Sequence, residues 1–280
     1  MGVEQFFGIF RQIKELDLPK TEILPPFEGV YASFYADSFQ RFEGDIGWYL
    51  EHMREGRQEV LDLGCGSGRT AIPFACAGHG VTGVDLSKDM LHRGRSKIRS
   101  IHPKIDPNIT LIEGDARTLD LERTFDYTVI GGLTIPLLLA TEERRLVLAT
   151  ARRHLHPGGV LLFDYLPTIP GERPSESHFI IPTGAPGMRG FMLLGCRRNP
   201  DENYQVTNLY TELVSSLGQT RRFLSNTACT VLDANELGAE LTGLGFEIMD
   251  SEDIYMDDET ASAAGTQNWP MRLVACRVLS

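Results

Sequence analysis

The sequence predicts an α/β fold: a doubly wound parallel sheet with an N-terminal helical cover and an inserted antiparallel β-meander. Strands and helices alternate from residue 59 onward, the residues before that have helical periodicity, and three strand-like runs interrupt the alternation after residue 166. With 280 residues, 42% of them hydrophobic, the chain is long enough for one large core or one core with an elaborate lid.

The N-terminal segment, residues 1–57, is predicted to be a helical cap. Apolar side chains recur at helical spacing at Val3, Phe6, Phe7, Phe10 and Ile13. Prolines then break the chain, and an aromatic-rich helical stretch follows at 31–42. We expect the apolar stripe to pack on the core or on a partner subunit.

Residues 58–166 carry the alternating pattern of the core sheet. Strands are expected at 59–63, 80–86, 109–116, 125–132 and 160–166, and helices at 69–78, 87–98 and 141–154. Ser87 and Thr141 are the expected N-caps of the last two helices.

Residues 167–232 change the pattern and are expected to form a lid. The stretches 167–176 and 182–187 are typical of loops, and strands are expected at 189–198, 204–214 and 221–232. Short turns join these strands, so neighbours should pair antiparallel.

Residues 233–280 should complete the core sheet. A helix is expected at 233–245, where Asp233 and Glu236 have capping-box spacing, followed by strands at 246–254 and 271–279.

Composition excludes several function classes. The net charge of −11 disfavours nucleic acid as a partner, because neutralising phosphates requires clustered Lys and Arg. No apolar run is long enough to span a bilayer, and the N-terminus lacks a secretory pattern, so we expect a cytoplasmic protein. Five scattered cysteines with no C-x-x-C pair indicate reduced thiols and no metal site.

Three glycines follow the first core strand. Gly64, Gly66 and Gly68 lie between a strand and a helix, where backbone N–H groups and the helix dipole can face a ligand. A tight turn without any ligand is the alternative. Asp85 ends the next strand about 20 residues further on, where a carboxylate can accept both hydroxyls of a ribose. Asp115, between Gly114 and Ala116, ends the third strand, where an adenine would lie.

The glycine spacing distinguishes between nucleotides. A dinucleotide site needs G-x-G-x-x-G, whereas this chain has G-x-G-x-G preceded by Asp62. A carboxylate here would repel a pyrophosphate and would suit a ligand that carries an amine or a sulfonium.

Four segments in order resemble the motifs of class I S-adenosylmethionine-dependent methyltransferases: "VLDLGCGSG", "VTGVDLS" with Met90, "LIEGDA" and "RHLHPGGVLLFDY". The resemblance implies a seven-stranded Rossmann-like sheet whose final strand is antiparallel. It implies S-adenosylmethionine as cofactor and S-adenosylhomocysteine as product.

The resemblance also implies roles for individual residues. Asp62 and Gly64 would hold the methionine end, Asp85 the ribose, Met90 the adenine face, and Asp115 the adenine amino group. Gly131 to Thr134 would border the transferring methyl. The full expected cofactor set is Tyr31, Asp62, Gly64, Cys65, Gly66, Gly68, Asp85, Leu86, Met90, Gly114, Asp115, Ala116 and Gly131.

The residues after the fourth strand narrow the choice of methyl acceptor. They read "IGGLTIP", not the Asn- or Asp-Pro-Pro-aromatic motif of nucleobase and amide methylation, and no carboxylate cluster for a divalent metal is found. The meander is similar to the lid of glycine N-methyltransferase and of amino-sugar N,N-dimethyltransferases. The expected activity is methyl transfer to an amine or hydroxyl of a small metabolite in a bacterial biosynthetic pathway.

Several side chains are candidates for the reacting centre. They are Tyr31 and Tyr35 in the N-terminal cover, Asp164 and Tyr165 after the fifth strand, and His178 in the lid. A packing role for Tyr165 and a surface position for His178 are the alternatives.

Two other functions stay open on the sequence. The fold could bind S-adenosylmethionine and catalyse a non-methylating reaction such as cyclisation, or it could be a non-enzymatic scaffold. A homodimer is also expected, because of the apolar N-terminal helix and the exposed sheet edges.

Overall fold

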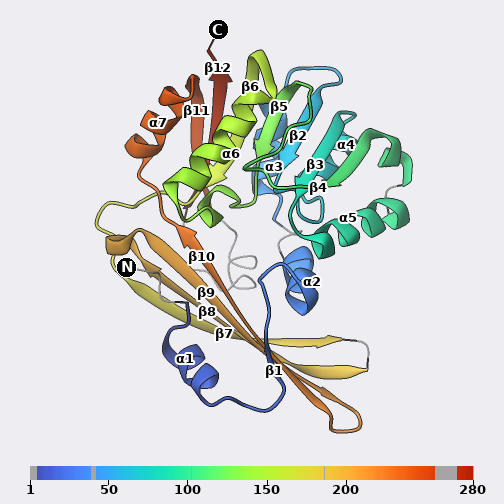
Figure 1. Ribbon diagram of the computed structural model, residues 1–280, viewed down its shortest axis with the longest axis vertical. Helices are drawn as coiled ribbons and strands as arrows, with labels where there is room; N and C mark the ends of the chain where they lie inside the picture. The colour runs from blue at the N-terminus through green and yellow to red at the C-terminus, as the bar shows by residue number, and fades with distance from the viewer. Residues whose placement is uncertain (1–4, 39–41, 102, 186, 256–269, 280) are drawn as a thin grey trace.

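The computed structural model describes residues 5–38, 42–101, 103–185, 187–255 and 270–279. Two β-sheets organise the chain: one with helices on both faces, and a long, mostly antiparallel sheet beneath its carboxyl edge (Figure 1). The prediction of an α/β fold is confirmed. Within the described ranges, no helix is both long and apolar enough to cross a membrane.

The first sheet has seven strands in the order β11-β12-β6-β5-β2-β3-β4. The strands are β2 (Glu59–Leu63), β3 (Gly80–Asp85), β4 (Ile109–Glu113), β5 (Phe125–Ile130), β6 (Leu155–Tyr165), β11 (Phe246–Tyr255) and β12 (Pro270–Val278). β12 runs antiparallel to both its neighbours, while β2 to β6 pair in parallel. The strand order reverses between β2 and β5, so the loops after these two strands diverge and leave a crevice.

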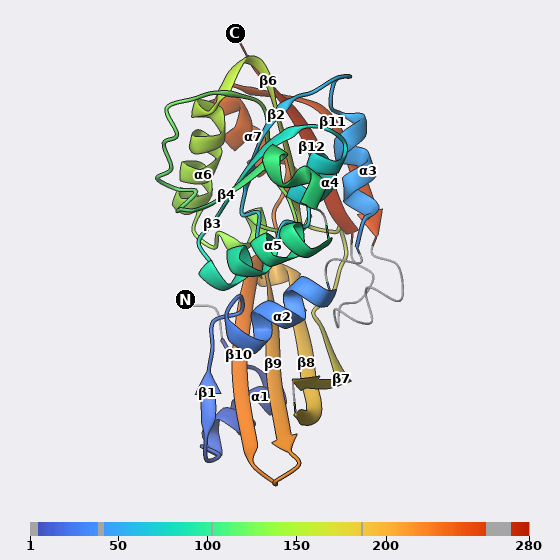
Figure 2. The ribbon, with the colours of Figure 1, turned by 90° about the vertical axis from the view of Figure 1, so that its right-hand side faces the viewer.

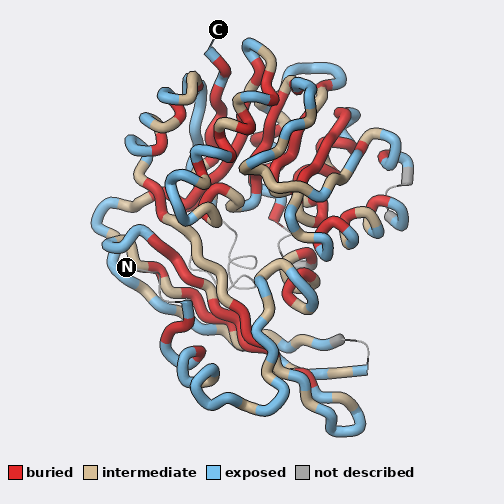
Figure 3. The backbone as a smooth tube through the Cα atoms, viewed as in Figure 1, coloured by how far each residue is buried: buried red, intermediate tan, exposed pale blue. Residues whose placement is uncertain are grey.

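Two apolar clusters sandwich this sheet. Its helices are α3 (Gly44–Glu51), α4 (Ala71–Cys76), α5 (Lys88–Ile101), α6 (Thr141–Arg153) and α7 (Ala234–Gly243). Trp48 of α3 and Phe74 of α4 pack on one face, and Leu148 of α6 and Leu237 of α7 pack on the other. The buried strands therefore run through the centre of this part of the molecule (Figure 3).

Two of the three predicted helix caps are present. The Asp233 carboxylate accepts from the N–H groups of Asn235 and Glu236 at 2.8 and 3.1 Å, and Ser87 Oγ accepts from Met90 N at 3.2 Å. The cap predicted at Thr141 is wrong. Helix α6 begins at Thr141 itself, preceded by an N-cap residue, Ala140, that has no side-chain hydrogen bond.

The second sheet has the strand order β1-β10-β9-β8-β7. Its strands are β1 (Thr21–Ile23), β7 (Ser175–Ala185), β8 (Met188–Asn199), β9 (Tyr204–Ser215) and β10 (Thr220–Thr230). Two of them were not predicted. β1 has only three residues, and β7 contains Pro182, a residue that strands tolerate at a sheet edge, where its missing N–H breaks no ladder.

Helices α1 (Gly8–Glu15) and α2 (Gly29–Ser38) cover opposite faces of this second sheet. Phe6, Phe7 and Phe10 are buried against Val206 and other β9 side chains. The alternate β9 side chains, among them Leu209, pack with α2. The stripe from Phe6 to Ile13 thus packs on a sheet of its own chain, while Val3 lies outside the described residues.

Helix α2 lies between the two sheets (Figure 2). Gly29 N, at its start, donates to Asp89 Oδ2 at 2.7 Å, and Ser87 Oγ donates to the Phe27 carbonyl at 2.7 Å. These contacts attach α2 to the start of α5.

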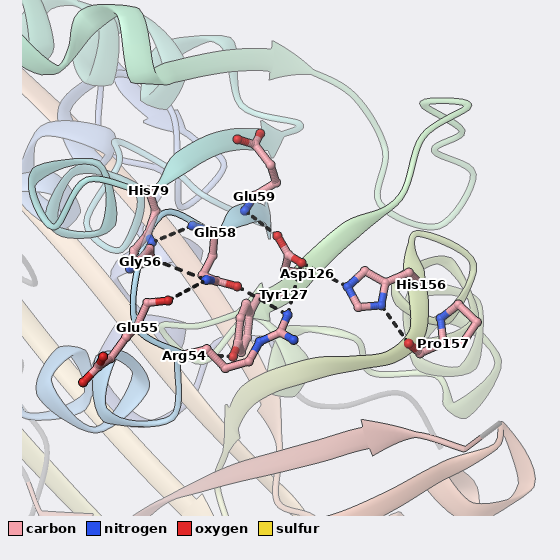
Figure 4. Close-up of polar contacts among 10 residues, drawn as sticks. All are labelled: Arg54, Glu55, Gly56, Gln58, Glu59, His79, Asp126, Tyr127, His156 and Pro157. Atoms are coloured by element: carbon pink, nitrogen blue, oxygen red, sulfur yellow. Dashed lines mark hydrogen bonds and ion pairs between the residues drawn. The ribbon is translucent and has the colours of Figure 1, made fainter.

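A polar network fixes the amino ends of the strands, opposite the crevice (Figure 4). Asp126 accepts from Glu59 N at 2.8 Å, from His156 Nε2 at 3.0 Å and from Arg54 Nη2 at 3.2 Å. The pKa of His156 is raised, first by its hydrogen bond to the Pro157 carbonyl and then by the one to Asp126. This network holds the loop before β2 in register with β5.

Candidate functional site

A cavity of about 470 Å³ lies between the carboxyl edge of the first sheet, helix α2 and the second sheet. The loops after β2, β3, β4 and β5 line one side, and residues of β8, β9 and β10 line the other. Its volume falls in the range of small-molecule sites, roughly 300–1,000 Å³.

The glycine loop after β2 requires glycine for two reasons. Gly64, Gly66 and Gly68 have φ angles of +78°, +54° and +86°, in the left-handed region that other residues rarely adopt. A Cβ on Gly64 would lie 2.6 Å from Thr134 Cγ2, and one on Gly66 would lie 3.2 Å from Met90 Cε. The backbone of this loop can therefore approach a ligand closely.

Asp85 lies at the carboxyl end of β3 and lines the cavity. Its two carboxylate oxygens accept from Gly66 N at 2.8 Å and from Ser87 N at 2.7 Å. Burial raises its pKa, and these two hydrogen bonds oppose that effect. A carboxylate has about four lone-pair positions, so two remain for the hydroxyls of a ligand.

Asp115 also lines the cavity, as part of an ion-pair network that the sequence did not predict. Arg117 lies 2.7 Å from Asp115 Oδ2 and 2.5 Å from Glu143 Oε1. Hydrogen bonds from Arg117 lower the pKa of the Asp115 carboxyl. Both Arg117 and Glu143 line the cavity, and Glu143 comes from the first turn of α6.

Asp164 anchors the loop after β5 from below. Its fully buried carboxylate accepts from Gly132 N at 2.7 Å, Leu133 N at 2.6 Å and Tyr49 Oη at 2.7 Å. Burial raises its pKa to about 6. Asp164 does not line the cavity, but it fixes two residues, Gly132 and Leu133, that do.

Arg69 crosses from the glycine loop toward α3. It makes two hydrogen bonds to the buried Asp45 carboxylate, at 2.8 and 2.6 Å. The Asp62 carboxylate lies under the same loop, where it accepts from Thr70 Oγ1 at 2.5 Å. Its other oxygen is buried without a partner in the described chain, and burial raises the pKa of Asp62 to about 7.

Most of the predicted cofactor residues are brought together around the cavity. Those that line it are Gly64, Cys65, Gly66, Asp85, Leu86, Met90, Gly114, Asp115, Ala116 and Gly131. Asp62 and Gly68 support the loop from outside the lining. Among the residues that the structure describes, no group of three or more His, Cys, Asp or Glu is placed to hold a metal.

The two predicted tyrosines of the cover differ in position. Tyr35 lines the cavity, and its hydroxyl lies 3.3 Å from Thr227 Oγ1. Tyr31, also predicted at the site, does not line the cavity. It is fully buried against the second sheet, where its hydroxyl donates to the Leu209 carbonyl at 3.3 Å.

Tyr165 and His178 also lie away from the cavity. Tyr165 is buried beside Phe163 in the apolar cluster on the α6 face, because consecutive strand residues point to opposite faces and Asp164 takes the other. His178 lies on β7, stacked on Phe10 at 6.0 Å and 3.3 Å from Glu176. Neither is positioned to act on a ligand there.

Five cavity residues come from the second sheet and were not predicted: Leu194, Gln205, Thr207, Thr227 and Cys229. Alternation along a strand indicates that 205 and 207 share a face, as do 227 and 229. It does not indicate which face meets the first sheet.

Comparison with known proteins finds methyltransferases. Residues 60–159 match the model of a methyltransferase domain. The chain is 35% identical, over 124 residues, to a cypemycin N-terminal methyltransferase from Streptomyces, a match that covers 43% of this chain and 47% of the relative. These two matches indicate a methyltransferase domain over residues 60–159.

Another relative of this methyltransferase domain is the dTDP-3-amino-3,4,6-trideoxy-alpha-D-glucopyranose N,N-dimethyltransferase of Streptomyces venezuelae. It is 29% identical over 138 residues, with 48% of this chain and 55% of the relative covered. The match spans only about half the length of these relatives.

The fold is shared over a greater length. The sugar N-methyltransferase KedS8 from Streptoalloteichus superposes with a TM-score of 0.65 at 21% identity, covering 90% of this chain and 94% of that one. The glycopeptide N-methyltransferase MtfA, solved with S-adenosylmethionine, gives a TM-score of 0.54 at 22% identity, covering 84% and 93%. S-adenosylmethionine is the cofactor of this family.

Proposed function

We propose that this chain transfers a methyl group from S-adenosylmethionine to an amine or hydroxyl of a small metabolite. One observation carries the proposal: a single cavity joins the glycine loop and Asp85 of the first sheet to side chains of the second sheet. Cofactor and acceptor can therefore meet in one cavity.

The residues present fit the cofactor. The glycine loop leaves its backbone open to the methionine end, and the unpartnered oxygen of Asp62 lies beneath that loop. In the proposed arrangement Asp85 accepts from the ribose hydroxyls. Asp115 accepts from the adenine amino group, and Met90 packs on the adenine face.

The cofactor would supply an electrophilic methyl group, and the residues of this chain would hold that methyl and the acceptor in line. Gly131 to Thr134 border the methyl in this proposal, and Asp164 holds that loop through two backbone N–H groups. Holding the reactants in line is worth up to roughly 7–11 kcal/mol in well-oriented systems. Burial raises the pKa of Tyr35 to about 12, which favours the protonated hydroxyl at neutral pH.

We propose the following division of the chain into a cap, a cofactor-binding core and a lid. Residues 1–57 form the cap, 58–166 and 233–280 the cofactor-binding core, and 167–232 the lid. A bacterial biosynthetic role agrees with the Streptomyces origin of the two relatives named above. We also propose a homodimer, which light scattering tests.

The decisive experiment uses S-adenosylmethionine labelled in its methyl group. Calorimetry first measures S-adenosylhomocysteine binding, with NAD as the negative control. A screen of amine and hydroxyl metabolites then monitors label transfer and S-adenosylhomocysteine release together. Folded protein that binds no S-adenosylhomocysteine would remove the proposal.

A non-methylating reaction is the second candidate. The chain is 34% identical over 140 residues to a carboxy-S-adenosyl-L-methionine synthase from Chromohalobacter salexigens, with 46% of this chain covered. A reaction that consumes S-adenosylmethionine without releasing S-adenosylhomocysteine would favour this candidate.

A further inference from the structure

Gln205 is a buried polar side chain at the cavity wall, and its oxygen has no hydrogen-bond partner in the described chain. It lies on β9, is 6% exposed and lines the cavity. Its carboxamide oxygen makes no hydrogen bond within the described chain. A buried acceptor without a hydrogen bond lowers the stability of the folded state. The unpaired oxygen in a cavity of ligand size therefore indicates that a bound ligand donates a hydrogen bond to it.

Arg198, the register partner of Gln205 on β8, does not line the cavity and is paired with Glu172 at 2.7 Å. The other side chains of the second sheet that line the cavity beside Gln205 are uncharged. Cys229 is its register partner on β10, and burial raises the pKa of that thiol to about 12. Thr207 Oγ1 lies 3.8 Å from Cys196 Sγ, while Thr227 is engaged with Tyr35. Each of these two hydroxyls has a partner, whereas the Gln205 oxygen has none within the described chain.

The rest of this end of the cavity is apolar. Phe34 of α2, Leu194 of β8 and Leu133, Leu137 and Leu138 of the loop after β5 line it. Such a surface favours the apolar body of a ligand over a polyhydroxylated one.

No unpaired cation faces this space among the described lining residues. The two arginines in the lining are Arg69, which is bound to Asp45, and Arg117, which is bound to Asp115 and Glu143. With Asp85, the carboxylates of the lining outnumber its arginines. A phosphate would meet net negative charge here, without the fork of donors that phosphate recognition uses.

We propose that Gln205 recognises the methyl acceptor, and that this acceptor is an uncharged, mostly apolar molecule that donates one O–H or N–H hydrogen bond to the Gln205 carboxamide oxygen. The inference rests on the proposed function, because it places the acceptor in this cavity. It excludes acceptors that carry a phosphate or a nucleotide. An amine acceptor would enter in its neutral form, which attacks a methyl group without a general base.

Three probes with the same aromatic ring test this. Ligand-observed NMR measures the binding of 2-phenylethanol, ethylbenzene and 2-phenylethyl phosphate, with and without S-adenosylhomocysteine. We expect the alcohol to bind roughly three- to tenfold more tightly than ethylbenzene, the worth of one neutral hydrogen bond, and the phosphate to bind more weakly than either.

Variants assign that preference to one side chain. Gln205→Leu should remove the difference between alcohol and hydrocarbon, whereas Gln205→Glu, which keeps an acceptor oxygen, should retain it. Gln219→Leu, the same substitution at a turn outside the cavity, is the matched control. A preference that survives in Gln205→Leu, or that wild type never shows, would overturn the proposal, as would tighter binding of the phosphate.

Failure of the proposed function can be distinguished from failure of this inference. Titration with S-adenosylhomocysteine reports on the glycine loop and Asp85, and Gln205→Leu should leave that affinity unchanged. A protein that binds the alcohol through Gln205 but not S-adenosylhomocysteine would lose the methyltransferase proposal and keep the recognition site.

Discussion

Replacing Asp85 probes the cofactor site most directly. Asp85 lines the cavity, and its two carboxylate oxygens accept hydrogen bonds from Gly66 N at 2.8 Å and Ser87 N at 2.7 Å. Asp85→Ala removes both the proposed ribose contacts and the link between the glycine loop and the end of β3.

The expected loss depends on the number of hydrogen bonds. A hydrogen bond to a charged group contributes about 1.5–3 kcal/mol, and water can enter the space that alanine leaves. We therefore expect a loss of at least one such bond, which corresponds to a roughly 10- to 100-fold increase in the dissociation constant of S-adenosylhomocysteine.

Asp85→Asn makes the test sharper. Both carboxylate oxygens accept from backbone N–H groups, and the amide of asparagine would set its own NH₂ against one of them. Asparagine should therefore impair binding nearly as much as alanine, although its shape is almost unchanged. If instead Asp85→Asn keeps wild-type affinity, charge and hydrogen bonding at this position do not hold the ligand.

Calorimetric titration with S-adenosylhomocysteine measures all three proteins. Asp201→Ala, an exposed carboxylate outside the cavity, is the control for the loss of one negative charge. Circular dichroism checks that each variant is folded. Unchanged affinity in Asp85→Ala would mean that the ribose lies elsewhere.

Three further predictions concern the loop, the buried acid and the core. Gly66→Val should abolish detectable S-adenosylhomocysteine binding in a folded protein, because the φ of +54° and the 3.2 Å approach to Met90 both exclude a branched side chain; calorimetry that finds wild-type affinity would contradict the described loop. Because the pKa of Asp62 is raised to about 7, the folded state holds a proton that the unfolded state releases near pH 4. Stability should therefore fall as pH rises through 7, and Asp62→Asn should make the melting temperature nearly constant between pH 5 and 7.5. An identical pH profile in the variant would show that Asp62 ionises normally. Glu240→Ala should destabilise the fold by about 3–5 kcal/mol in urea denaturation, because it leaves Arg144, which is 5% exposed, buried without its carboxylate at 2.6 Å; a loss below about 1 kcal/mol would show that water reaches this pair.

The edge of the sheet where the cofactor residues gather could be predicted from the residues alone. Gly64, Asp85 and Asp115 each come after a different parallel strand, and the carboxyl ends of parallel strands meet at one edge whatever the rest of the chain does. This arrangement depends on local strand patterns and the handedness of βαβ units, both of which can be recognised in the residues.

The identity of the side chains that face the cavity depended on tertiary packing. Tyr31 and Tyr35 are four residues apart on α2 and both hydroxyls reach the second sheet, yet only Tyr35 also lines the cavity. Likewise, the alternation of side chains along β9 indicates which residues share a face with Gln205, but not which part of the molecule packs on that face.

The physical reason is range. The periods of helices and strands are set by bonds between residues close in sequence or paired in register, so a pattern along the chain predicts them. The choice between two apolar faces depends on what else the chain packs there. In this protein that choice placed Phe6, Phe7 and Phe10 on one side of the second sheet and left Gln205, with its unpaired oxygen, on the side that encloses the cavity.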